Sequence, residues 1–190
     1  AYGLLLERSN NNTTTLTGDI STTGIDAYGL RLYYSTSNTT TLNGDITTAG
    51  RNAAGLYLYK KHSNTTTLNG DISTTGDDAY GLRLYDSNSN TTNLTGGIST
   101  TGDDAAGLYL ESSSNINTTT LTGDITTTGT NAHGIYSESS DTNTFTVNGN
   151  ITTNGAGAYA INNDANSADN TFTLGGVVSG GILNAGTNTV

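Results

Sequence analysis

The sequence predicts an all-β protein, a three-sided parallel β-solenoid (β-helix) of about seven rungs of 26 residues, in which one rung is one full turn of the coil. The first observation is a repeat: the string at 38–50, Asn-Thr-Thr-Thr-Leu-Asn-Gly-Asp-Ile-Thr-Thr-Ala-Gly, returns along the whole chain at steps of 26 or 27 residues. A fixed period of about 20–50 residues is typical of solenoids, propellers and arrays. The second is that no stretch shows a helical period, and the third is that apolar residues recur at fixed phases.

Each repeat unit reads as three short strands separated by corners. The units begin at Ala1, Ala27, Ala53, Ala79, Ala105, Ala132 and Ala158. The segments are Ala-x-Gly-Leu-x-Leu, then Asn-Thr-Thr-Thr-Leu, then Asp-Ile-Ser/Thr-Thr-x-Gly, and glycines such as Gly44 and Gly50 are expected to turn corners with a positive φ. A propeller blade needs about 40 residues. A coil fits better, with each strand pairing in parallel with its copy one rung away at about 4.8 Å.

Alternation within the strands predicts which side chains face the interior. In the second segment the inward positions are a Thr column that ends in two Phe residues, and a Leu column; the third segment adds an Ile column. These columns are Thr14, Thr40, Thr66, Thr92, Thr119, Phe145 and Phe172; Leu16, Leu42, Leu68, Leu94, Leu121, Val147 and Leu174; and Ile20, Ile46, Ile72, Ile98, Ile125, Ile151 and Val177. The stacked copies predict one continuous array over residues 1–190, with a degenerate last rung at 158–190.

An asparagine opens the second segment of every unit. We interpret this column as a structural ladder, because each corner amide can bond to the equivalent amide one rung away. Glycan attachment at sequons such as Asn38-Thr39-Thr40 is the alternative, but the Phe145 and Phe172 rungs keep the Asn and lose the sequon. The ladder is Asn12, Asn38, Asn64, Asn90, Asn117, Asn143 and Asn170.

The amino-acid composition limits the classes of binding partner that are expected. Hydrophobic residues make up 32% of the chain and charged residues 12%, there is no Cys, and the net charge is −10. Nucleic acid and anionic membrane surfaces need clustered Lys and Arg, so neither is expected as a partner. Membrane insertion is not expected either, since no apolar run approaches the roughly 20 residues of a membrane span. The chain starts in phase with a repeat, so we expect a processed product or a fragment of a longer array.

An aspartate column follows the second segment, at Asp19, Asp45, Asp71 and Asp124, and is interrupted by Gly97 and Gly176. Carboxylates about 4.8 Å apart repel by roughly 1 kcal/mol per pair even in water. A bound calcium ion would relieve this repulsion, and calcium is the only cofactor considered. Because the glycine spacing of calcium-loading β-rolls is absent, we favour solvated turn carboxylates, with no metal and no cofactor.

The outward threonines of the second segment form two columns. They are Thr13 and Thr15, Thr39 and Thr41, Thr65 and Thr67, Thr118 and Thr120, Thr144 and Thr146, and Thr171 and Thr173, broken only by Asn93. This pattern resembles the Thr-x-Thr face of β-solenoid ice-binding proteins, which implies ice binding as an alternative function. The simpler interpretation is that Thr suits an outward strand position.

On the outer face of the first segment, large residues alternate in character from rung to rung. One column holds Leu5, Arg31, Tyr57, Arg83, Tyr109 and Tyr136, and Tyr33, Tyr59 and Tyr85 stand two residues further on. Stacked Arg and Tyr side chains gain about 0.5–1 kcal/mol each by cation–π contact when exposed. We expect a stabilising surface ladder; an aromatic strip for carbohydrate or a neighbouring filament is the functional alternative.

Catalysis is not expected. His62 and His133 fall in different columns, and no Ser-His-Asp or metal-ligand spacing is present. Enzymatic β-helices build a cleft from long loops between strands, whereas these rungs hardly vary. A carbohydrate-binding or carbohydrate-cleaving β-helix is therefore the weakest alternative.

The stretch at 117–136, Asn-Thr-Thr-Thr-Leu-Thr-Gly-Asp-Ile-Thr-Thr-Thr-Gly followed by Ala-x-Gly-Ile-Tyr, resembles the repetitive passenger regions of bacterial autotransporter and adhesin proteins. The resemblance implies a secreted or surface-exposed stalk, hence an extracellular or cell-surface location. Since the first and last units follow the repeat, we expect the chain to stack head to tail on itself into a fibre or to form part of a longer stalk.

Overall fold

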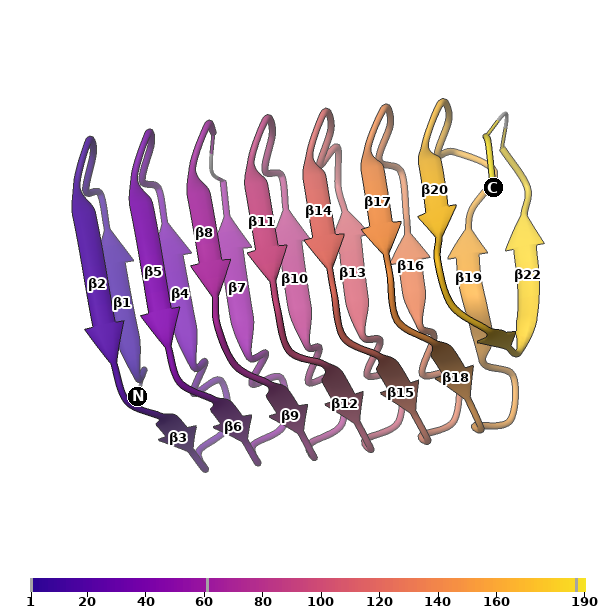
Figure 1. The fold of residues 1–190 in the computed structure, drawn as a ribbon, viewed down its shortest axis with the longest axis horizontal. Helices are drawn as coiled ribbons and strands as arrows, with labels where there is room; N and C mark the ends of the chain where they lie inside the picture. The colour runs from indigo at the N-terminus through magenta and orange to yellow at the C-terminus, as the bar shows by residue number, and fades with distance from the viewer. Residues whose placement is uncertain (1, 61, 187) are drawn as a thin grey trace.

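The computed structural model describes residues 2–60, 62–186 and 188–190, and it confirms the predicted three-sided parallel β-solenoid. The rungs line up along the long axis of the molecule, with the N-terminus at one end and the last rung at the other (Figure 1). Within those residues there is no helix, and hence no helix long and apolar enough to cross a membrane.

Sheet A, built from the first segment of each unit, has eight strands, one more than the seven units supply, because the chain continues into an eighth turn. The first five strands start at the first Leu of Ala-x-Gly-Leu-x-Leu rather than at the Ala. In order they are β1 (Leu4–Glu7), β4 (Leu30–Tyr33), β7 (Leu56–Tyr59), β10 (Leu82–Tyr85), β13 (Leu108–Glu111), β16 (Ile135–Ser137), β19 (Tyr159–Asn163) and β22 (Gly181–Asn184).

Sheets B and C have seven strands each, and every neighbouring pair is parallel. Sheet B consists of β2 (Thr13–Thr17), β5 (Thr39–Asn43), β8 (Thr65–Leu68), β11 (Thr91–Leu94), β14 (Thr118–Leu121), β17 (Thr144–Val147) and β20 (Thr171–Leu174). Sheet C consists of β3 (Ile20–Thr22), β6 (Ile46–Thr48), β9 (Ile72–Thr74), β12 (Ile98–Thr100), β15 (Ile125–Thr127), β18 (Ile151–Thr153) and β21 (Val178–Ser179).

The core follows the predicted columns. The Leu and Ile side chains of the middle rungs are buried, and Phe145 and Phe172 stack inside with ring centroids 4.9 Å apart and planes within 5°. The prediction for Val177 is wrong: Val178 pairs with Ile151, and Val177 is 71% exposed. The unit that contains Val178 is one residue longer than 26, which moves the inward position by one and turns Val177 outward.

The expectation of a positive φ at Gly50 is also wrong. Gly50 is needed because a Cβ there would lie 1.9 Å from the carbonyl oxygen of Gly24 in the preceding rung. The positive φ falls two residues later, at Asn52 (φ 57°), and at its equivalents Asp26, Asp78, Asp104 and Asn131. Asn and Asp tolerate this conformation better than other residues with a side chain.

Two sets of inward threonines differ in their hydrogen bonds. Those at the end of the first five sheet C strands donate to a backbone carbonyl five residues on, as Thr74 Oγ1 does to Ala79 O at 2.6 Å. In sheet B, among the described residues, the fully buried hydroxyls of Thr40, Thr66 and Thr119 have no hydrogen-bond partner. A buried polar group without a partner costs about 1–3 kcal/mol.

We therefore expect Thr66→Val to raise the free energy of unfolding by about 1 kcal/mol, because valine has nearly the same shape and no hydroxyl to desolvate. Thr74→Val is the matched control and should lower it by about 1–3 kcal/mol, because it leaves the Ala79 carbonyl unpaired in the interior. Urea unfolding followed by circular dichroism measures both. Equal destabilisation by the two changes would contradict the hydrogen-bond assignment.

Candidate functional site

The asparagine column runs inside the corner between sheets A and B. Six of its seven members are at most 2% exposed, and only Asn12, in the first rung, is open to solvent. The backbone N–H of Asn38 donates to Asn64 Oδ1 at 2.9 Å, and Asn64 Nδ2 donates to the Ser35 carbonyl at 2.9 Å and to Asn90 Oδ1 at 3.2 Å. The same bonds recur along the stack. Each amide thus connects three successive rungs, and burial leaves no room for a glycan on Asn38.

The aspartate column lies exposed at the corner between sheets B and C. Asp19 Oδ1 accepts the backbone N–H of Asp45 at 2.9 Å, and Asp45 Oδ1 accepts that of Asp71 at 2.8 Å. Near the C-terminal end, Asn150 Oδ1 accepts the Val177 N–H at 2.9 Å, so Val177, and not Gly176, occupies this column. Each carboxylate therefore satisfies a backbone donor of the next rung, which offsets the repulsion between neighbours.

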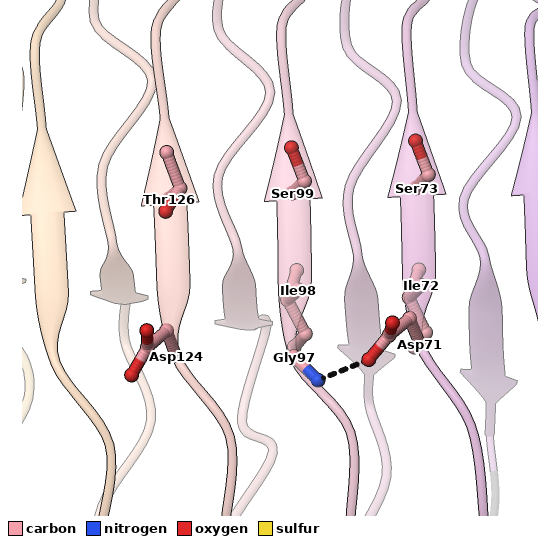
Figure 2. Close-up of a pocket in the computed structure, with 8 residues that line it drawn as sticks. All are labelled: Asp71, Ile72, Ser73, Gly97, Ile98, Ser99, Asp124 and Thr126. Carbon is pink, nitrogen blue, oxygen red and sulfur yellow. Dashed lines mark hydrogen bonds between the residues drawn. The ribbon is translucent and has the colours of Figure 1, made fainter.

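Gly97 interrupts the aspartate column and leaves a shallow hollow between Asp71 and Asp124 (Figure 2). Asp71 still reaches across and accepts the Gly97 N–H at 2.7 Å, as Figure 2 shows. The two carboxylates stand two rungs apart, with only Ser73, Ser99 and Thr126 hydroxyls beside them. In the part of the chain that the structure describes, no three His, Cys, Asp or Glu side chains are grouped to hold a metal ion.

The outer face of sheet B carries the predicted threonine columns in unbroken parallel register. Thr39 pairs with Thr65, Thr41 with Thr67, and the pairing continues through all seven strands. Asn93 is the one substitution in the second column, and none of the outward positions of these strands is charged. The face is a regular, uncharged array of hydroxyls and methyl groups.

The outer face of sheet A places Arg31, Tyr57, Arg83, Tyr109 and Tyr136 in one column, as the strand register shows. Tyr57 lies between two guanidinium groups, with Arg31 at 5.5 Å and Arg83 at 5.2 Å from its ring centroid. Arg83 also forms an ion pair with Glu111. The structure differs from an exposed strip in one respect: Tyr57 is only 5% and Tyr109 only 7% exposed.

Neighbouring tyrosines, which the sequence interpretation missed, cause this burial. Tyr28 packs on Tyr57 with centroids 4.8 Å apart at 41°, and Tyr80 packs on Tyr109 at 4.7 Å and the same angle. The position after each unit's first Ala is Tyr in the rungs that carry Arg and Ala in the rungs that carry the buried Tyr. The reciprocal alternation of Tyr28, Ala54, Tyr80 and Ala106 was visible in the sequence and indicates a structural repeat of two rungs.

Tyr33, Tyr59 and Tyr85 form a continuous stack along the adjacent column. Successive rings lie 5.1 Å apart with planes within 22° and 13° of parallel. Ring faces therefore cover each other, and mainly ring edges point outward. A sugar stacks on an open ring face, so this stack offers little to a carbohydrate ligand. Tyr34, which is 42% exposed, packs edge-on against Tyr33 and Tyr59.

His133 occupies the Tyr28 column in the sixth rung and is 8% exposed. Its Nδ1 accepts the Tyr159 N–H at 3.0 Å, and its Nε2 lies 2.9 Å from the Asn162 amide nitrogen. Burial lowers the pKa of His133, and the Asp104 carboxylate opposes this shift. His133 is therefore neutral at pH 7. Beside it, burial raises the pKa of Tyr136 to about 12, with Glu138 adding to the shift.

We expect stability to fall on mild acidification because of His133. The folded-state pKa of His133 is below the ordinary value of about 6.5, so the unfolded chain takes up the proton first. The free energy of unfolding is highest above that ordinary value. It falls as the pH drops below it, by at most about 1.4 kcal/mol per unit, until the folded form is protonated too.

Thermal melts at pH 7.5 and 5.5 measure the effect. His133→Ala is the control, since Ala54 and Ala106 occupy the same column, and this variant should show a smaller difference between the two melts; His62 is present in both proteins and cancels. An equal pH dependence in the variant would exclude His133 as its source.

No protein-family model, no curated protein and no solved structure matches this chain. The site must therefore be interpreted from its own geometry.

Proposed function

We propose that this chain is a non-enzymatic structural element of the cell surface or extracellular space, which stacks end to end into a fibre or forms part of a longer solenoid stalk. The main observation behind this proposal is the arrangement of the strands at the two ends of the coil. Strands β1, β2 and β3 edge the three sheets at one end, and β22, β20 and β21 edge them at the other. In the described residues these edges leave strand N–H and C=O groups without a partner strand, except that residues 188–190 cover part of β20, where the Phe172 N–H donates to Thr189 O. The uncovered edges at the two ends are complementary head to tail.

The last turn leaves apolar side chains of sheet A open. Ile182 pairs with the fully buried Ile161 of the preceding rung but is itself 47% exposed, and Leu183 is 41% exposed. A contact between ends, or flanking chain of the same fold, would cover Ile182 and pair the strand edges in one step. The likeness of the repeat at 117–136 to autotransporter passenger regions supports the stalk form and a surface location.

Electron microscopy of the 190-residue chain tests stacking. We expect long thin fibres with an axial repeat of about 34 Å, because seven rungs are stacked at a spacing of about 4.8 Å. The change Ile182→Lys should shorten or abolish them, because it places a charge where stacking would continue the inward column of Ile161. Thr120→Lys adds the same charge to the side of the coil and should leave the fibres intact. A monodisperse monomer at high concentration would reject stacking and leave the longer covalent stalk.

Ice binding is the second candidate, favoured by the uncharged register of threonines on sheet B. Thermal hysteresis that disappears in Thr41→Tyr with Thr67→Tyr, and persists in Ser99→Tyr on sheet C, would support it. An adhesive or structural fibre should show no hysteresis.

A further inference from the structure

A hollow of about 370 Å³ opens beside sheet A over the fifth and sixth rungs. It exists because Ala106 occupies a column position at which Tyr80 and His133 stand in the adjacent rungs. Tyr109 and Tyr136, stacked with centroids 4.9 Å apart, line it together with two carboxylates, Asp104 and Glu138. Glu138 accepts the Tyr109 hydroxyl, which fixes the carboxylate against the aromatic wall.

The earlier rungs show what this kind of surface holds. There the small residue of the column is Ala54, and the neighbouring Tyr57 is flanked by Arg31 and Arg83. The two tyrosine pairs have nearly the same geometry. The ring centroids are 4.8 Å apart in the Tyr28–Tyr57 pair and 4.7 Å apart in the Tyr80–Tyr109 pair, and the ring planes meet at 41° in both. The chain thus supplies its own guanidinium groups to the first copy of the arrangement.

The second copy lacks one of these cations. Tyr109 has Arg83 on one side, at 5.9 Å, but on the other side the alternation Arg31, Tyr57, Arg83, Tyr109 is followed by Tyr136 where a third arginine would stand. No Lys or Arg follows Arg83 in the sequence. The charged side chains that line the hollow are therefore both acidic, while His133 accepts a backbone N–H through Nδ1.

We propose that this hollow binds a guanidinium or ammonium group from outside the chain, held against the half-buried Tyr136 ring by cation–π contact and by the Asp104 and Glu138 carboxylates. The cation is that of a small molecule or of an arginine on a second copy of this chain. This site does not depend on end-to-end stacking, since it lies on the side of the coil.

Titration of the 190-residue chain with arginine methyl ester, followed by two-dimensional ¹H–¹⁵N NMR, tests the proposal. We expect saturable shifts centred on Asn131, His133 and Tyr136. The uncharged analogue citrulline methyl ester should produce shifts only at much higher concentration, because it retains the shape and loses the cation. Glu138→Gln should weaken binding about tenfold. Asp71→Asn, which removes one carboxylate from another face, should leave binding unchanged.

Tyr136→Arg provides a test in which the variant is not expected to destabilise the fold. This change continues the alternation within the chain, so it should raise the melting temperature and abolish the response to arginine methyl ester. Shifts that do not saturate, equal binding of citrulline methyl ester, or equal affinity in Glu138→Gln and Asp71→Asn would overturn the proposal. Sedimentation separates the two sources. Arg51, whose side chain is 67% exposed, is the arginine that a second copy could offer. Concentration-dependent dimers lost in both Glu138→Gln and Arg51→Gln identify the second copy, and their absence with the titration intact identifies a small cation.

Discussion

Replacing Leu68 with Asp is expected to unfold or fray the array around the third rung. Leu68 is 1% exposed in β8 and pairs with Leu42 on one side and Leu94 on the other. Burying a carboxylate without a partner costs several kcal/mol, and the lost leucine contacts add about 2–5 kcal/mol. Since each rung contacts only its neighbours, damage in the middle separates the two halves of the array.

Thr67→Asp is the matched control, because it introduces the same carboxylate at the next residue, on the outward side of the same strand. We expect it to change stability little. Circular dichroism melts of both variants compare them directly. If they melt alike, the assignment of inward and outward positions in sheet B is wrong.

Asn64→Ala is expected to have the second large effect. The change removes an acceptor for the Asn38 N–H and donors to the Ser35 and His62 carbonyls, at the 1% exposed corner between sheets A and B. Each buried group left without a partner costs about 1–3 kcal/mol, so a total of about 3–5 kcal/mol is expected unless water enters the corner. The loss also interrupts the amide column between its neighbours.

Asn69→Ala provides the comparison on the exposed surface. Asn69 makes a similar amide contact, to Asn43 Oδ1 at 2.7 Å, but in water. We expect a loss below about 0.5 kcal/mol. Urea unfolding gives both values, and similar losses in the two variants would show that burial of the amide column contributes little.

The sequence was enough to predict which residues make up the candidate surfaces, but not how deeply each of them is buried. The columns of Asn, Asp, Thr, Arg and Tyr were predictable because the register follows directly from the repeat: each residue pairs with its own copy. The burial of Tyr57 and Tyr109 was not, because it comes from Tyr28 and Tyr80, which reach across rungs from a different position in the unit. The alternation with Ala54 and Ala106 was the available signal.

The sequence by itself determined the fold class, the three sides of the coil and the inward columns, because a fixed period combined with alternation leaves one way to bury Leu, Ile and Phe in stacked copies. Only the tertiary structure decided which valine enters the last rung, where a glycine is needed and where the hollow at Ala106 opens. These features depend on atoms of one rung meeting atoms of the next. Spacing along the chain fixes which residues meet but not how their side chains share the space between rungs.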